Sequence, residues 1–187
     1  QQDDLPLCLG FICHSTFRDK KACMRFEQLM ERYRPSVVQF FTPAVAGNNI
    51  ERAQSYGAKV LAQVGSYREA LEAIEAGADG LIVQGSEAGG HGLRRELGNA
   101  TFPLARAVLE KVPITMPVIA AGGIVDGRTM AAALTLGCDG VVLGTRLWAS
   151  FESMGKQAYK DRLVEANSCD DVVRTTTFDA IMNTYSK

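Results

Sequence analysis

The feature that most constrains this chain is a short repeat, in which a helix-ending glycine is followed by a tight turn and an apolar strand. The repeat occupies residues 76–83, as Ala-Gly-Ala-Asp-Gly-Leu-Ile-Val, and residues 136–143, as Leu-Gly-Cys-Asp-Gly-Val-Val-Leu. A shorter form, Tyr-Gly-Ala-Lys-Val-Leu, lies at 56–61. Strands that are apolar on both faces are typical of parallel sheets covered by helices. The repeat therefore predicts a parallel α/β protein, and its recurrence favours a barrel over an open doubly wound sheet.

The rest of the chain alternates in the same way between short β-branched runs and helical patterns. Six runs have the length and composition of strands: residues 5–13, 37–41, 59–64, 80–84, 118–121 and 141–144. A closed (β/α)8 barrel needs eight strands and typically about 250 residues. We therefore expect a single domain, residues 1–187, that forms a partial TIM barrel with about six of its eight βα units and without the two N-terminal strands. A truncated chain, a split gene product and a degenerate paralog are all compatible with this pattern.

Helical patterns lie between the strand runs. In the first, apolar residues recur at helical spacing and a proline follows them: Ala22, Phe26, Leu29 and Tyr33, then Pro35. Ser66 and Glu69 form a capping-box pattern at the start of a helix that stops at Gly77. Asp126 can cap a further helix that ends at Gly137.

Composition limits the classes of partner. The formal net charge of −1 provides no basic surface for nucleic acid or for an anionic membrane. The longest apolar runs have the length of strands and are too short to cross a bilayer. We therefore expect small-molecule partners, with neither nucleic acid nor a membrane among them. The sequence leaves the oligomeric state open.

The cysteine pattern predicts no metal and no disulfide framework. No two of the five cysteines form a C-x-x-C pair: they are Cys8, Cys13, Cys23, Cys138 and Cys169. We interpret them as reduced thiols buried as small hydrophobic groups. Reduced thiols imply the cytoplasm or another reducing compartment.

Three glycine-containing segments follow predicted strands, where barrels of this class place their active sites. They are residues 84–92 (Gln-Gly-Ser-Glu-Ala-Gly-Gly-His-Gly), 120–124 (Ala-Ala-Gly-Gly-Ile) and 144–146 (Gly-Thr-Arg). Glycines let the backbone approach a ligand and turn N–H groups toward it, and the second segment could form an anion site at a helix N-terminus. Each turn alone is explained by tight-turn glycines. Their order, after consecutive strands near the C-terminus, indicates a ligand that carries a phosphate.

His91 is the strongest catalytic candidate among the ionisable residues. It is one of only two histidines, and it directly follows Gly89 and Gly90 at the expected active face. The alternative is a structural hydrogen-bonding role, which is the commoner fate of a lone histidine. Glu87 fits a solvated or loop-bracing carboxylate better than an acid catalyst, and His14 fits a loop residue.

Four other conspicuous residues are interpreted as structural. Asp79 and Asp139 lie in the turn before a strand, at the end of a barrel opposite its active face, so we do not expect them to be catalytic. Trp148 and Phe151 are interpreted as packing residues rather than as a base-stacking platform.

Together, residues 84–91, 120–124 and 143–146 resemble the successive signatures of the nitronate monooxygenase family, formerly called 2-nitropropane dioxygenases. The Glu-Ala-Gly-Gly-His segment at 87–91 is specific to this family and a few flavin-barrel relatives, which include a flavin-dependent enoyl-acyl-carrier-protein reductase. The resemblance runs through nearly the whole chain, from the strand at 9–12 to residues 177–178.

The resemblance implies an FMN-dependent oxidation of alkyl nitronates, and of nitroalkanes as a further substrate class, with O2 as the electron acceptor and with a carbonyl compound and nitrite as products. His91 would then act on the substrate, as a base for neutral nitroalkanes or as a partner for the nitronate. Position by position, the resemblance assigns two groups to the cofactor: Gln63, Gln84, Gly85, Ala88, Gly89 and Gly90 line the flavin, and Ala121, Gly122, Gly123, Gly144 and Thr145 hold its phosphate.

Two departures from the family pattern keep other functions open. Gln63 stands where some members carry Lys, which removes a positive charge that could stabilise the reduced, anionic flavin. Family members also carry two earlier strands, the first with a Gln-Ala-Pro-Met-like segment against the flavin. The alternatives are a relative of the flavin-dependent enoyl-thioester reductase and a non-catalytic or partial paralog.

Overall fold

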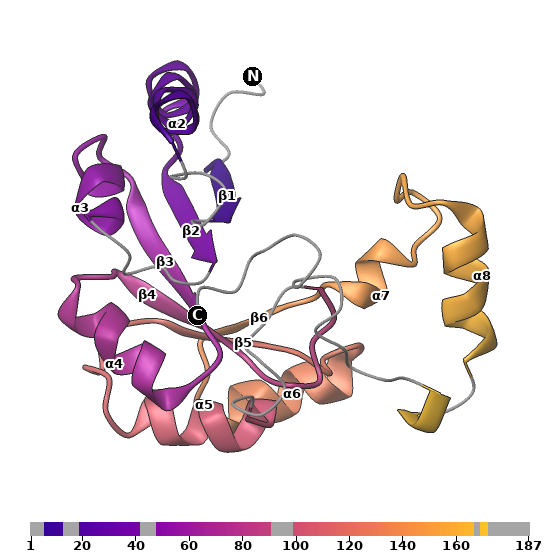
Figure 1. The fold of residues 1–187 in the computed structure, drawn as a ribbon. Coiled ribbons are helices and arrows are strands. Elements are labelled where there is room, and N and C mark those ends of the chain that lie inside the picture. Colours follow the sequence, from indigo (N-terminus) through magenta and orange to yellow (C-terminus); the bar gives the residue numbers. More distant parts are fainter. Residues whose placement is uncertain (1–5, 13–18, 42–47, 91–98, 167–168, 172–187) are drawn as a thin grey trace.

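The strands form one parallel sheet in the order of the chain. The computed structural model describes residues 6–12, 19–41, 48–90, 99–166 and 169–171. Its six strands pair in the order β1-β2-β3-β4-β5-β6 and curl into a half-barrel (Figure 1). Their bounds are β1 Cys8–Ile12, β2 Val37–Phe41, β3 Lys59–Val64, β4 Gly80–Gln84, β5 Val118–Ala121 and β6 Gly140–Val142. The predicted partial TIM barrel with six βα units is thereby confirmed.

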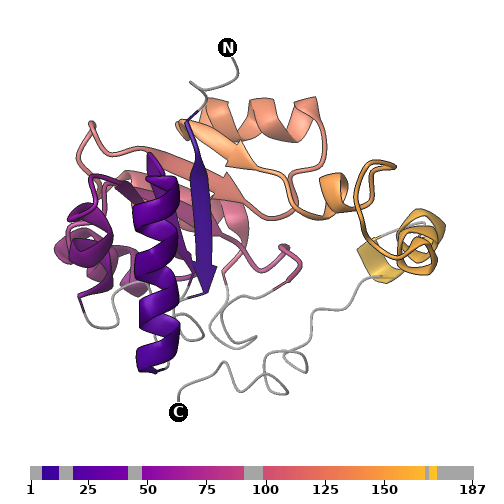
Figure 2. The ribbon, with the colours of Figure 1, turned by 90° about the horizontal axis from the view of Figure 1, so that it is seen from above.

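Helices connect the strands and lie along the outer side of the sheet from α2 to α6 (Figure 1). Their bounds are α2 Lys20–Tyr33, α3 Asn49–Gln54, α4 Tyr67–Glu75, α5 Thr101–Leu109, α6 Gly127–Leu136, α7 Thr145–Trp148 and α8 Gln157–Glu165, followed by the 3-10 turn η1 at Cys169–Asp171. In both ribbon views α8, drawn in yellow, lies away from the sheet (Figure 2).

The hydrophobic core fills the layer between the sheet and these helices. Alternate strand residues face it and are at most 2% exposed: Val38, Phe40, Val60, Ala62, Val64, Leu81, Val83, Val118 and Ala120. Phe26 of α2 packs edge-on against Phe11 of β1, with 5.0 Å between ring centroids. Full burial of such a side chain contributes about 1.5–3 kcal/mol. The other residues of β2 and β3 face the concave side and are only partly covered, whereas β4 is buried on both faces, as its sequence predicts.

The aspartates of the repeat hold neighbouring strands in register. The backbone N–H of Asp79 donates to the Val60 carbonyl, and the Val60 N–H donates to the Asp79 carboxylate, both at 2.9 Å. Asp139 makes the same pair of bonds with Val118, both at 2.8 Å. In the shorter repeat Lys59 takes the aspartate position, and its Nζ donates to Asp79 at 2.7 Å. These aspartates therefore work at the strand N-termini, as predicted, far from the active end.

Helix ends follow the capping residues that the sequence predicts. Ser66 accepts from the N–H of Glu69, while the Glu69 carboxylate reaches one residue beyond the predicted box and accepts from the Gly65 N–H at 2.8 Å. Asp126 forms a complete capping box with Thr129, and α6 ends at Gly137, whose φ of 110° is readily adopted only by glycine.

Two predicted strands had wrong bounds. Residues 6–7 of the predicted first strand lie before β1, and the predicted last strand began one residue late and ended two residues late. β6 ends at Val142, and residues 143–144 lie outside it. Val142 pairs with Ala121, the last residue of β5. Gly122, with a φ of 109°, turns the chain away from the sheet. The residues after Val142 therefore have no β5 residue to pair with.

Several predicted packing positions are exposed. Phe151 is 95% exposed and Trp148 41%, because the segment that carries them projects from the sheet. In α2 the buried pair is Phe26 and Met30, while Leu29 and Tyr33 face solvent in part. Among the cysteines whose side chains the structure describes, only Cys138 is buried; Cys23 is intermediate and Cys8 is exposed.

We predict that Asp139→Ala lowers the free energy of unfolding by about 1–3 kcal/mol, because the buried Val118 N–H loses its acceptor. Urea unfolding followed by circular dichroism measures this change. Asp139→Asn keeps a side-chain carbonyl oxygen and should lose less. Equal losses in the two variants would show that the acceptor is not what matters.

Asp79 should make stability depend on pH. Partial burial alone would raise the pKa of Asp79, but hydrogen bonds from Lys59, Gln54 and the Val60 N–H outweigh it and hold the pKa below its ordinary value. A lowered pKa stabilises the fold above the unfolded-state pKa of about 3.9, and this stabilisation is lost as the pH falls through the folded-state pKa. The difference in unfolding free energy between wild type and Asp79→Asn should therefore shrink on acidification. A difference that stays constant with pH would contradict this assignment.

Candidate functional site

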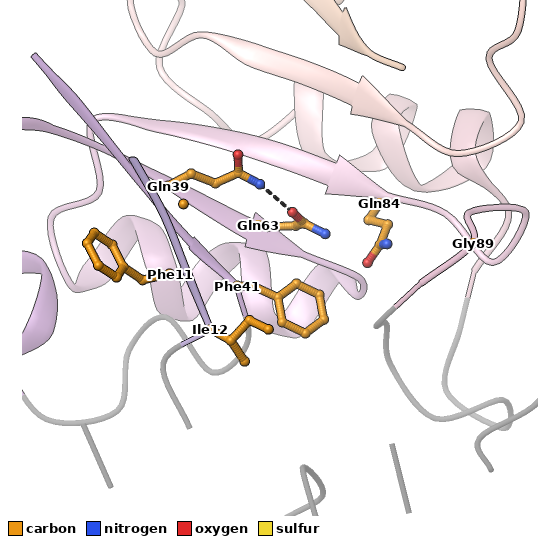
Figure 3. A pocket seen from close by; sticks show the side chains of 8 residues that line it. Phe11, Ile12, Gln39, Phe41, Gln63, Gln84 and Gly89 are labelled. Carbon is orange, nitrogen blue, oxygen red and sulfur yellow. Dashed lines mark hydrogen bonds between the residues drawn. The ribbon is translucent and has the colours of Figure 1, made fainter. Parts of the chain in front are cut away.

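A pocket of about 290 Å³ opens at the C-terminal ends of β1 to β4, on the concave side of the sheet (Figure 3). This volume is close to the lower end of the range for ligand pockets, about 300–1,000 Å³. The lining combines apolar and carboxamide side chains with two glycines: Gly10, Phe11, Ile12, Gln39, Phe41, Gln63, Gln84 and Gly89. Three of the predicted site residues, Gln63, Gln84 and Gly89, thus share one pocket.

Three glutamines from consecutive strands form its polar wall. Gln39 of β2 donates from Nε2 to Oε1 of Gln63 of β3 at 2.6 Å. This bond directs the Gln63 nitrogen away from Gln39 and toward Gln84 of β4 (Figure 3). The carboxamides can donate to and accept from a planar ligand that carries both N–H and carbonyl groups on one edge. Gln39 was missed by sequence reasoning; as the one polar residue of a strand run, it carried a detectable signal.

The three predicted glycine segments meet at this end of the sheet. A Cβ on Gly122 would lie 3.0 Å from the Ala88 nitrogen, and one on Gly123 would lie 3.2 Å from the Glu87 Cβ. A Cβ on Gly89 would lie 3.1 Å from Oγ1 of Thr145. The loops after β4, β5 and β6 therefore touch one another, which confirms the prediction that they share one face. Ala121 lies beside them, paired with Gln84.

The contact between the first two loops is fastened by Glu87 and Thr101. The Glu87 carboxylate accepts from the Thr101 N–H at 3.0 and 3.1 Å and from the Thr101 hydroxyl at 3.0 Å. Thr101 is the first residue of α5, whose N-cap residue Ala100 provides no side-chain bond. Glu87 therefore braces its loop, in line with one of the two roles predicted for it. Thr101 was missed, because a threonine at a helix start is a common capping pattern.

Gly85 makes backbone hydrogen bonds to both neighbouring segments of the site. Its N–H donates to the Ala121 carbonyl at 2.9 Å, and its own carbonyl accepts from the Ala88 N–H at 3.1 Å. A Cβ on Gly85 would overlap Thr101. Both backbone polar groups of Gly85 are therefore used within the fold, and its assignment to the flavin stays a prediction.

The glycines of the predicted anion site, Gly122 and Gly123, do not lie at the N-terminus of α6, which begins at Gly127. Asp126 and Thr129 cap that helix with their own side chains. Gly122 and Gly123, with φ of 109° and 67°, instead turn the chain beside Ala88 and Glu87. An anion at these glycines would rely on loop N–H groups and on the neighbouring Gly144–Thr145 segment. A Cβ atom added to Gly144 would meet no other atom within 4 Å.

Two predicted residues lie outside the described part of the chain. His91 and His14 both fall there, so the catalytic assignment of His91 stays a prediction. Within the described ranges, no group of three or more His, Cys, Asp or Glu residues could hold a metal ion. Over the same ranges, no helix is both long and apolar enough to span a membrane.

A parallel half-barrel with glycine loops gathered at the carboxyl ends of its strands belongs to the TIM-barrel class, which builds its active sites at that end. Residues 16–184 match the nitronate monooxygenase family, and the chain belongs to this family of oxidoreductases.

Three relatives illustrate the similarity. The nitronate monooxygenase npaC of Metarhizium robertsii is 38% identical over 164 residues, which cover 82% of this chain and 46% of npaC. The structure of FabK from Thermotoga maritima matches with a TM-score of 0.77 at 37% identity, over 93% of this chain and 52% of FabK. Nitroalkane oxidase from Streptomyces ansochromogenes matches with a TM-score of 0.68 at 33% identity, over 78% of this chain and 43% of the oxidase. The chain spans about half the length of these relatives.

Proposed function

We propose that this chain forms the FMN-binding part of a flavin oxidoreductase that oxidises alkyl nitronates, and neutral nitroalkanes, with O2 to a carbonyl compound and nitrite. The observation that carries the proposal is the meeting of three glycine loops beside a pocket walled by carboxamides. Membership of the nitronate monooxygenase family and likeness to a nitroalkane oxidase support the nitro substrate.

The residues present fit a flavin nucleotide. Ile12 and Phe41 offer an apolar surface for a ring system, while Gln63 and Gln84 offer amide groups to its polar edge. The phosphate end is assigned to loop N–H groups near Gly144, where an added Cβ would meet no atom within 4 Å, and Gly90 is assigned to the flavin ring. The remaining loop residues assigned to the cofactor are Ala88, Gly89, Ala121, Gly122, Gly123 and Thr145.

In this proposal the chain's own residues bind and orient, and one of them moves a proton. The bound flavin would take electrons from the substrate and pass them to O2. His91 follows the loop glycines, so its side chain would face the substrate while the backbone faces the cofactor. A histidine pKa of about 6.5 suits removal of the α-proton of a nitroalkane near neutral pH.

The likeness to FabK favours a second candidate, reduction of an enoyl thioester. That reaction needs an electron donor such as a nicotinamide cofactor. Oxidation of NADH that depends on an enoyl thioester would support this candidate. Nitrite release from a nitronate under O2 would support the first.

Gly144→Ala provides a sharp test of the phosphate site. The added Cβ would meet no atom within 4 Å, so the fold should be unaffected, but the methyl group would occupy the space assigned to the phosphate. We expect FMN to bind about tenfold more weakly, equivalent to about 1.4 kcal/mol, with riboflavin binding unchanged. Flavin fluorescence titration and thermal unfolding measure both.

The matched control for this test is Gly127→Ala, at the exposed start of α6, where a Cβ also meets no atom within 4 Å. Gly123 is a poorer choice, because its φ of 67° strains any substituted residue. An unchanged preference for FMN over riboflavin in Gly144→Ala would remove Gly144 from the phosphate site.

His91→Asn tests the proton-transfer role. We expect this variant to keep its FMN and to lose about 10²–10⁴-fold of its turnover on neutral nitroalkanes, since these need a base. Turnover on preformed nitronates should fall less, because they are already deprotonated. The control is His14→Asn. A His91→Asn protein that holds FMN and oxidises nitroalkanes at the wild-type rate would exclude His91 as the base.

A further inference from the structure

We propose that Glu87 and Thr101 form a positioning device, called here the α5 clasp, that sets the preference of the site for a phosphorylated flavin. The clasp would act by fixing the distance between the loop after β4 and the glycine pair after β5. This inference rests on the proposed FMN function and assigns a role to two residues that do not line the pocket.

The first part of the argument is steric. Thr101 is 2% exposed, and its hydroxyl oxygen lies where two glycines lack a side chain. A Cβ on Gly85 would overlap this oxygen, and one on Gly122 would lie 2.8 Å from it. Thr101 thus fills the gap between the two loops, and both loops must carry glycine to admit it.

The second part is polar. The Thr101 hydroxyl lies 3.0 Å from the Gly122 carbonyl and 3.3 Å from the Ala121 carbonyl, in addition to 3.0 Å from the Glu87 carboxylate. A hydroxyl has one proton to donate, so it alternates among acceptors from both loops. The Thr101 N–H adds a bond that holds Glu87.

The third part concerns helix α5, which anchors the clasp. Leu104, Ala105 and Val108 of this helix are at most 3% exposed. The bonds from Thr101 therefore tie the two loops to the hydrophobic core. Gly122 and Gly123 are among the residues whose N–H groups are assigned to the phosphate. By holding the Gly122 carbonyl, the clasp fixes the direction in which these donors point.

The test compares FMN with riboflavin, which lacks the phosphate, in wild type, Thr101→Val, Thr101→Ser and Glu87→Ala. We expect Thr101→Val and Glu87→Ala each to weaken FMN binding about tenfold, with riboflavin affinity nearly unchanged. Thr101→Ser keeps the hydroxyl and should retain the wild-type preference. Glu87 is an exposed residue, so its variant should fold even where Thr101→Val does not. Thr135→Val, which removes one exposed hydroxyl bond on α6, is the control.

The double variant Glu87→Ala/Thr101→Val shows whether the two residues act together. If the two residues act as one unit, the double variant should lose no more of the preference for FMN over riboflavin than either single variant. If they act independently, the two losses should add. Equal weakening of FMN and riboflavin, or additive losses, would overturn the clasp.

These outcomes also separate the clasp from the proposed function. If wild type shows no preference for FMN over riboflavin, the phosphate site itself fails, and the clasp fails with it. If wild type has the preference, Gly144→Ala abolishes it and Glu87→Ala leaves it intact, only the clasp is wrong.

Discussion

Parallel pairing in register is the constraint on which the rest of this structure depends. Asp79 and Asp139 each bind both backbone groups of a residue at the start of the preceding strand. With the strand starts held level, Gln84, Ala121 and Val142 come to the same height at the other end, where they pair across β4, β5 and β6. The glycine loops that follow begin side by side for this reason. A shift of one residue would move side chains to the opposite face of the sheet.

One face of the sheet packs in the hydrophobic core, and the other lines the pocket. The face toward α2 to α6 is filled with apolar side chains and supplies most of the stabilisation from burial. The concave face carries the row Gln39, Gln63 and Gln84, and the pocket opens on it. Gln39 and Gln63 are tolerated there because their strands are only partly covered on that face and because the two side chains bond to each other. Gln84 is buried, on the strand that is covered on both faces. Stability and binding are thus separated by side-chain alternation along the same strands.

Predictions from sequence succeeded where the determinant is local. The aspartate and serine caps, the helix-ending glycines and the bounds of four of the six strands follow from residue chemistry within a few positions. The end of β6 was placed too late, because it depends on where β5 leaves the sheet. Phe151 and Cys8 were expected to be buried, but their exposure depends on how segments distant in sequence pack.

For the site, the sequence by itself determined which loops carry glycine, that they follow strands, and the family to which the chain belongs. Only the tertiary structure decided that the Gly85 N–H bonds to Ala121, that Gln39 joins the pocket wall, and that Thr101 lies between two loops. The physical reason is the range of each effect. Backbone conformation and capping act within a single turn of chain, whereas these contacts join residues 14 to 36 positions apart that meet only once the sheet has curled.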